Sequence, residues 1–224
     1  MLLTPKYIFA DDFRDLQDYF SARPHQTVSF RQGEYLWAPD EPFNKIFYIT
    51  EGIAQTFMNH DSGKRRILSF HAQGTVYPMF HYKQYKLESS LLCSAMTHVK
   101  ALEFTQEQFS LMFEENAALR HHVIDHFSSS TNLLLYEIGH QEQNDSFVKL
   151  CNLLYLLLIS ESARNHYLRN LTQEDLANIL GISINNVTRS LTKLRQNNII
   201  ETGRKIITVT DPDKLGELCS GETL

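Results

Sequence analysis

The chain has 224 residues, of which 42% are hydrophobic, 11% are aromatic and 21% are charged, and its formal net charge is −5. These proportions are typical of a globular protein of one or two domains and exclude a disordered chain, while the acidic balance gives no overall sign of a nucleic-acid binder. No apolar run approaches the roughly 20 residues that span a bilayer, and the first residues do not form a signal peptide, so we expect a cytoplasmic protein without membrane contact. The three scattered cysteines fit a reducing compartment and are one thiolate short of a four-cysteine iron–sulfur site.

The N-terminal half is predicted to be mostly β-structure. A short helix is expected first, at residues 11–21, because Phe13, Leu16 and Phe20 share one face at helical spacing. Short β-type runs separated by turns then extend to residue 104, and the segment NHDSG between two of them predicts a hairpin. The runs are 28–30, 35–37, 45–50, 53–58, 65–70 and 97–104. This many short strands indicates an antiparallel barrel or sandwich.

Helical patterns follow from about residue 105. The sequence TQEQ at 105–108 predicts a capped helix start, and a long helix is expected from 116 to 143. Apolar side chains recur along it at spacings of 3, 4, 3 and 4, which favours a coiled-coil seam between two helices of a dimer. The alternative is a helix packed on its own barrel. The seam residues are Ile124, Phe127, Thr131, Leu134 and Ile138.

The polar segment QEQND at 141–145 is the expected hinge between domains, and an apolar helix is predicted at 146–161. Residues 166–209 then follow the order strand, helix, turn, helix, hairpin, which is typical of a winged helix-turn-helix. Thr172 and Ser183 are placed as N-caps of the two helices, and Gly181 supplies the turn between them. The wing is IIETGRKIITV, with Arg204 and Lys205 at its tip.

The second helix of this segment has a polar outer face without acidic residues. No Asp or Glu occurs from residue 182 to residue 200, and residues 172–209 carry a net charge of +2. A helix that is merely solvated usually favours Glu and Lys. Amides, hydroxyls and cations can contact base edges and phosphates, so the pattern indicates DNA binding. The expected DNA-binding residues are Thr172, Ser183, Ile184, Asn185, Asn186, Thr188, Arg189, Lys193, Arg204 and Lys205.

The whole arrangement resembles the CRP/FNR superfamily, the bacterial regulators related to the cyclic-AMP receptor protein. The resemblance rests on F-x-x-G-E at 30–34 with IFYITEGIAQTF, and on LTQEDLANILGISINNVTRSLTKLRQNNII at 171–200. It implies an α+β fold with an antiparallel β-roll of the cyclic-nucleotide-binding type and a short N-terminal helix (1–115), a dimerisation helix (116–143) and a winged helix-turn-helix (144–224). It also implies a homodimeric transcription regulator that binds inverted-repeat DNA and contacts RNA polymerase.

The recognition helix departs from the cyclic-AMP branch in a way that predicts its target. Arg189 matches an arginine that the family keeps, and we expect it to reach a guanine or its neighbouring phosphate. Asn185 stands where that branch carries a glutamate, and its amide suits adenine, while Ile184 suits a thymine methyl. The half-site is therefore expected to be richer in A·T than a cyclic-AMP-type site.

The cyclic-nucleotide signature is absent. Pro78, Met79 and Phe80 stand where the family has Gly-Glu-Leu, and Glu88-Ser89 where it has Arg-Ser, so a carboxylate would repel a ligand phosphate. Aromatic side chains and lysines between 77 and 86 suit instead a small aromatic or weakly acidic effector, or they simply cover the barrel. The expected effector pocket is Tyr77, Met79, Phe80, His81, Tyr82, Ser89, Ser90, Leu134 and Leu135.

The alternative function is a β-barrel enzyme or metal-binding protein with an accessory C-terminal domain. It is disfavoured because residues 27–104 hold scattered histidines without metal-ligand spacing and no recognisable nucleophile–base pair. His122 and His126 are four residues apart, but we expect them to be solvated or at an interface. Neither a metal nor a cofactor is expected. Cys93 and Cys151 are assigned to the core, which leaves Cys219 as the exposed thiol.

Overall fold

The computed structural model describes residues 4–37, 44–83, 90–160, 171–203 and 206–224. The chain divides into two compact units. The sheet unit comprises residues 8–129, and the helical unit comprises residues 1–7 and 130–224. The three-part division expected from the sequence, with boundaries at 115 and 143, stays a prediction. Among the described residues, none of the helices combines the length and apolar character needed to cross a membrane.

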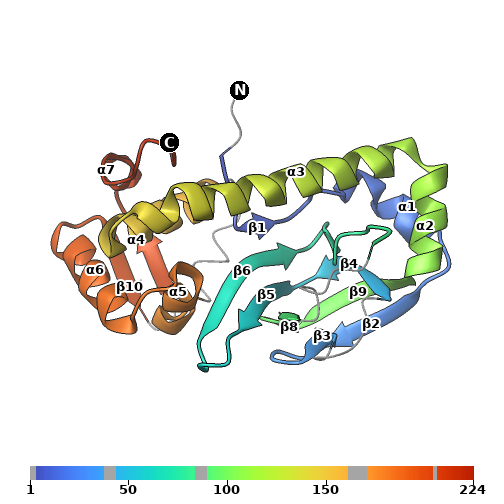
Figure 1. The fold of residues 1–224 in the computed structure, drawn as a ribbon, viewed down its shortest axis with the longest axis horizontal. Helices are drawn as coiled ribbons and strands as arrows, with labels where there is room; N and C mark the ends of the chain where they lie inside the picture. The colour runs from blue at the N-terminus through green and yellow to red at the C-terminus, as the bar shows by residue number, and fades with distance from the viewer. Residues whose placement is uncertain (1–3, 38–43, 84–89, 161–170, 204–205) are drawn as a thin grey trace. The chain divides into compact units, whose positions relative to one another are not determined.

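The sheet unit contains two β-sheets (Figure 1). One has the order β1-β6-β5-β8-β3 and the other β2-β9-β4-β7. Among the described residues of these sheets, the strand pairings are antiparallel except that of β1 with β6, which is parallel. The strands are β1 (Ile8–Phe9), β2 (Gln26–Phe30), β3 (Tyr35–Trp37), β4 (Lys45–Glu51), β5 (Ile53–Asn59), β6 (Arg65–Ala72), β7 (Val76–Tyr77), β8 (Leu91–Ala95) and β9 (Val99–Thr105).

All six predicted β-runs overlap strands, and the predicted hairpin joins β5 to β6. Its turn is closed by the amide of His60, which donates to the carbonyl of Lys64 at 2.8 Å, and Gly63 has a φ of +78° that suits glycine. Strand β8 contains Cys93, which the sequence placed in an apolar run typical of a strand, whereas β1 and β7 were not predicted. Each of these two strands has only two residues, too few to show the alternation that marks a strand.

The first predicted helix is shorter than expected. It begins as the 3-10 turn η1 (Arg14–Leu16) and continues as α1 (Gln17–Ser21). Residues 11–13 are not helical because the amides of Asp11 and Phe13 donate to the carbonyls of Gln73 and Gly74, at 2.9 and 2.8 Å. The predicted helical face itself is correct, since Phe13, Leu16 and Phe20 are all buried.

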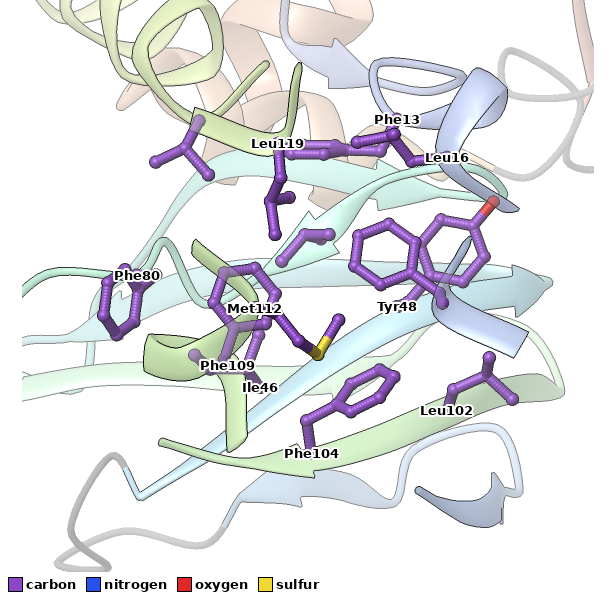
Figure 2. Packing of buried hydrophobic residues seen from close by; sticks show 13 residues of the cluster. Phe13, Leu16, Ile46, Tyr48, Phe80, Leu102, Phe104, Phe109, Met112 and Leu119 are labelled. Atoms are coloured by element: carbon purple, nitrogen blue, oxygen red, sulfur yellow. The ribbon is translucent and has the colours of Figure 1, made fainter. Parts of the chain in front are cut away.

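An aromatic-rich core packs these helices onto the sheets. Phe20 stacks on Tyr48 with ring centroids 4.6 Å apart, and Figure 2 shows Phe109 and Met112 beside Ile46 and Phe104. In Figure 1, α1 and α2 (Gln106–Glu115) lie together at one end of this unit. Burying large aromatic side chains stabilises a fold by about 1.5–3 kcal/mol each, so this cluster holds the helices in place.

Helix α2 (Gln106–Glu115) begins where the sequence predicted, because Thr105 and Gln108 form a reciprocal capping box. Asn116 is extended and separates α2 from α3 (Ala117–Gly139). The long helix therefore ends four residues before the expected 143. Residues 141–143 form the 3-10 turn η3 (Gln141–Gln143) instead.

The helical unit contains the predicted helix-turn-helix. It comprises α4 (Ser146–Ser160), α5 (Gln173–Leu180), α6 (Ile184–Gln196), β10 (Ile200–Gly203), β11 (Ile206–Val209) and α7 (Pro212–Glu217). Gly181 ends α5 in the left-handed conformation, at a φ of 65°, which allows the tight turn into α6. The paired strands β10 and β11 confirm the wing, whereas its tip and residues 166–170 of the expected strand lie outside the described residues. Helix α7 in the acidic tail was not predicted.

Candidate nucleic-acid interface

Helix α6 presents a polar face to solvent. Its inner side buries Val187, Leu191 and Leu194, as the apolar spacing predicted. Its outer side exposes residues of the expected DNA-binding set: Ser183, Ile184, Asn185, Thr188, Arg189 and Lys193. Ser183 caps the helix by accepting a hydrogen bond from the amide of Asn186 at 3.3 Å. The exposed face therefore starts at a helix N-terminus, where backbone amides favour anions such as phosphate.

A side-chain hydrogen bond ties α6 to the first residue of α5, whose N-terminus is itself capped. Thr188 Oγ1 lies 2.7 Å from Gln173 Oε1 and 2.9 Å from the carbonyl of Ile184, two acceptors that share its single proton. Thr172 Oγ1 accepts from the amide of Asp175 at 3.1 Å and donates to its carboxylate at 2.7 Å. Gln173 was missed by sequence reasoning. Its position directly after the N-cap Thr172 was the available signal.

Asn186 is half-buried and links α6 to α4. Its Nδ2 donates to Ser146 Oγ at 3.2 Å, and its Oδ1 accepts a hydrogen bond from the guanidinium of Arg189. Lys193 places its ammonium 3.9 Å from the ring centroid of Phe147, a cation–π contact. Lys193 is thus held against the first turn of α4, while Asn186 bonds both that turn and Arg189.

The wing is joined to the recognition helix by an arginine that sequence reasoning left out of the site. Arg195 donates to Thr202 Oγ1 of β10 at 3.3 Å and to Thr192 Oγ1 at 3.2 Å. Within the described ranges, no carboxylate forms an ion pair with Arg189, Lys193 or Arg195. The face therefore carries positive charge that can act on phosphates. Arg204 and Lys205 lie outside the described residues.

Helix α3 carries an exposed apolar stripe at the expected seam. The exposed fractions are 57% for Ile124, 52% for Leu134 and 72% for Ile138, and Thr131 is also exposed. Phe127 differs from them, because it is half-buried against the core cluster of the sheet unit. Leu135, which the sequence assigned to the effector pocket, is 65% exposed on the same helix.

Among the described residues expected to line an effector pocket, the two buried aromatic side chains belong to separate core clusters. Tyr77 is buried beside Trp37, whereas Phe80 belongs to the other core cluster and packs on Phe109 at 5.3 Å between ring centroids. Met79 and His81 are half-buried, Tyr82 and Ser90 are exposed, and Ser89 lies outside the described residues. Leu134 and Leu135 belong to the helical unit. An open hollow of about 430 Å³ is lined by Phe80, Tyr82, Gln106, Glu107, Ser110 and Leu111.

The expectation of solvated or interface histidines is wrong for His126, which is buried within the sheet unit, whereas His122 is half-buried. His126 is buried with Nδ1 3.1 Å from Asp12 Oδ2, and His122 Nε2 lies 3.0 Å from Asp15 Oδ2. His71 is buried near His126, with ring centroids 6.3 Å apart, and burial together with the neighbouring His126 lowers its pKa well below 6.5. Among the described residues, no group of three or more His, Cys, Asp or Glu side chains could hold a metal.

The cysteines follow the sequence expectation at two of three positions. Cys93 and Cys151 are buried. Cys219 is half-buried rather than exposed, its Sγ donates to the carbonyl of Leu215 at 3.3 Å, and burial raises its pKa to about 12. A thiol with this pKa is almost entirely protonated at neutral pH, so it is a weak nucleophile.

Comparisons with known proteins agree with this arrangement. Residues 27–116 match the cyclic nucleotide-binding domain family, and residues 148–218 match the Crp-like helix-turn-helix domain family. The transcriptional activator protein Anr of Pseudomonas protegens is 23% identical over 85% of this chain and 79% of its own length. The nitrogen fixation regulation protein FixK of Rhizobium meliloti is 22% identical over 88% of this chain and 89% of its own. The structure of FixK2 from Bradyrhizobium japonicum shares the fold, with a TM-score of 0.77 at 14% identity, covering 88% of this chain and 98% of that one.

Proposed function

Because the chain belongs to the CRP/FNR superfamily of transcription regulators and has its helix-turn-helix DNA-binding domain, we propose that it acts as a cytoplasmic homodimer on an inverted-repeat DNA site. We further propose that a small effector other than cyclic AMP controls it through the sheet unit. The observation that carries the DNA-binding proposal is the exposed, acid-free outer face of α6.

The chemistry of that face divides into two kinds of contact. Lys193, together with Arg204 and Lys205 of the wing, acts on phosphates and sets affinity. Asn185, Thr188 and Arg189 reach base edges in the major groove and set sequence preference. Thr172 contributes indirectly as an N-cap, since its hydroxyl is already engaged with Asp175. Asn186 likewise supports Arg189 from a half-buried position.

The homodimer is supported by the exposed stripe on α3. Large apolar side chains at helical spacing lose exposed area when a second copy of the helix packs on them, and this burial contributes about 25 cal/mol per Å². A two-fold dimer places two recognition helices against two half-sites. We therefore propose half-site centres about one helical turn apart. Contact with RNA polymerase is a further expectation from the family.

The effector proposal rests on the residues that replace the cyclic-nucleotide signature. Phe80 is buried against Phe109 and Phe113, so its side chain stabilises the core rather than binding a ribose. Pro78 has no backbone amide to donate to a phosphate. These replacements disfavour cyclic AMP and leave an aromatic or weakly acidic small molecule as the proposed class of effector.

A selection experiment tests the DNA-binding proposal. The purified chain is offered a pool of randomised duplexes, and the bound fraction is sequenced after repeated rounds. We expect an inverted repeat, and we expect Arg189→Ala to weaken binding to it by about tenfold or more, which is the loss of one good base contact. Arg31→Ala, an exposed arginine of the sheet unit, is the matched control and keeps wild-type affinity. Enrichment of no sequence, or equal losses in both variants, contradicts the proposal.

A further inference from the structure

A buried polar network closes the hinge between α3 and the DNA-binding helices. It consists of Tyr136 at the end of α3, Gln141 in η3, Asn152 on α4, and Ser220 and Thr223 after α7. We call these five residues the hinge network. All of them belong to the helical unit, and all except the half-buried Ser220 are buried.

Gln141 is the centre of the network. Its Nε2 donates to the carbonyl of Lys149 at 3.0 Å. Its Oε1 accepts from Asn152 Nδ2 at 3.0 Å and from the Tyr136 hydroxyl at 3.3 Å. A buried amide that makes all three bonds resists displacement, because each bond lost in the interior leaves an unsatisfied group costing about 1–3 kcal/mol. The turn at 141–143 is therefore held between α3 and α4.

The segment after α7 closes the network from the other side. Thr223 Oγ1 lies 2.8 Å from the Tyr136 hydroxyl and 3.1 Å from Ser220 Oγ. Ser220 donates its amide to Asn152 Oδ1 at 2.9 Å and accepts from Asn152 Nδ2 at 3.0 Å. Burial raises the pKa of Tyr136 to about 12, so its hydroxyl stays protonated for these bonds. Residues 87 positions apart thus join α3 directly to the C-terminal segment.

The network continues to the recognition helix through α4. The first turn of α4 contacts α6 at two points, the hydrogen bond between Ser146 and Asn186 and the cation–π contact between Phe147 and Lys193. A path of packed and bonded groups therefore runs from α3 through Gln141 and Asn152 to the outer face of α6.

We infer that Tyr136, Gln141, Asn152 and Thr223 are positioning residues that fix the angle between α3 and the recognition helix, with the segment 220–223 acting as a strap over the hinge. This inference rests on the proposed function, because α3 is the proposed dimer helix. In a dimer the angle at each hinge sets the separation of the two recognition helices. The hinge network then determines which spacing between half-sites is accepted.

The strap is tested with Thr223→Val, which removes one hydroxyl at nearly constant volume. Binding is measured to inverted repeats of the selected spacing and of spacings one and two base pairs longer and shorter, and to a single half-site. We expect Thr223→Val to bind the selected repeat about fivefold to tenfold more weakly, because the hydroxyl's bonds to Tyr136 and Ser220 are lost. We also expect its preference among spacings to flatten, while its affinity for a single half-site stays within about twofold of wild type.

Controls separate this role from a simple loss of stability. Thr223→Ser keeps the hydroxyl and restores the spacing preference. Thr50→Val removes a hydroxyl bond to Lys100 in the sheet unit and leaves the preference unchanged. If Thr223→Val lowers the unfolding temperature while keeping the wild-type spacing preference, the residue is structural only and the inference is overturned. Failure of the wild-type chain to bind any repeat overturns the proposed function as well, so the two failures are distinguishable.

Tyr136→Phe is a second variant that tests the network if Thr223→Val folds poorly. It removes the hydroxyl that bonds both Gln141 and Thr223. We expect the same flattened spacing preference, with losses in Tyr136→Phe and Thr223→Val that do not add in the double variant. Additive losses would mean that the two hydroxyls act independently, which contradicts a single network.

Discussion

His71 is a buried imidazole held between aromatic rings. Its Nε2 lies 3.1 Å from Ser69 Oγ, its ring centroid lies 3.8 Å from that of Tyr77, and its Nδ1 is buried without a hydrogen-bond partner. The other titratable groups near it are His126 and, beyond it, Asp12, which bonds His126. Desolvation disfavours the charged form, so His71 is neutral at neutral pH.

The lowered pKa of His71 predicts that acid destabilises the sheet unit. In the unfolded chain this histidine has a pKa near 6.5 and binds a proton before the folded chain does. The stability that the neutral, buried His71 provides is therefore complete above pH 6.5. As the pH falls from 6.5 towards the pKa of His71 in the folded chain, the free energy of unfolding decreases by at most about 1.4 kcal/mol per pH unit. His71→Gln should show a smaller drop in unfolding free energy between pH 7.5 and 5.5. The exposed His98→Gln is the control, and a drop equal to wild type in His71→Gln would contradict the prediction.

Asn185 is exposed at the second position of α6, where a side chain can reach a base edge. We predict that Asn185→Glu shifts the preferred pair at one symmetric position from A·T towards G·C. The reason is that an amide donates and accepts, as adenine requires, whereas a carboxylate only accepts, as the cytosine amino group requires. The expected discrimination is about 1–3 kcal/mol, measured by selection on randomised half-sites.

The exposed Asn197→Glu at the end of α6 provides a control with the same change in charge. It should weaken binding somewhat to every sequence and leave the base preference as it was. If Asn185→Glu behaves in the same way, Asn185 contacts a phosphate rather than a base.

At the scale of the element, α3 has two different faces. Val123, His126 and Leu133 are buried within the chain, while Ile124, Leu134 and Ile138 are exposed. The spacing in the sequence placed Phe127 on the same stripe as these exposed residues and could not tell it from them, and the seam itself stays a prediction. Phe127 packs against the core of the sheet unit, so Phe127→Asp would place a charge beside that core. The substitution would therefore disturb folding as well as assembly.

Ile138→Asp is therefore the sharper test of the dimer. We predict a folded monomer with strongly weakened affinity for the inverted repeat, because burying an unpaired carboxylate in a helix–helix seam costs several kcal/mol. Sedimentation velocity reports the assembly state, and circular dichroism reports the fold. His121→Asp places the same charge at an exposed position of α3 and should remain dimeric. An intact dimer in Ile138→Asp would rule out this stripe as the interface.

At the scale of the whole molecule, charge is unevenly distributed along an acidic chain. The net charge is −5, yet residues 172–209 carry +2 and include the outer face of α6. The molecule as a whole is repelled by DNA, and attraction arises from a small cationic surface. Association with DNA should therefore be strongly dependent on salt.

Lys193→Ala tests this electrostatic role. Each phosphate contact releases about one counterion, so the slope of log K against log salt should become shallower by about one, with similar losses for all sequences. Lys100→Ala, whose ammonium pairs with Glu51 in the sheet unit, should leave the slope unchanged. An unchanged slope in Lys193→Ala would mean that its ammonium stays on the Phe147 ring when DNA binds.

Features that depend on neighbours a few residues away along the chain are predictable from the sequence alone. The capping boxes at Thr105 and Thr172, the turn at Gly181 and the amphipathic α6 each follow from a local pattern of side chains and backbone donors. The order of these elements was sufficient to indicate the family and the DNA-binding surface.

The roles of the isolated polar residues depend instead on packing between elements that are distant in the sequence. Gln141 stands in a segment that the sequence assigned to a polar hinge, and His126 on a helix without an apparent partner, yet both are buried. Their partners, Asn152 and Asp12, lie 11 and 114 residues away. A side chain's periodicity predicts which face of an element it occupies, but its partner depends on which elements pack against that face. Such packing is set by the burial of the whole apolar core, and no local pattern encodes it.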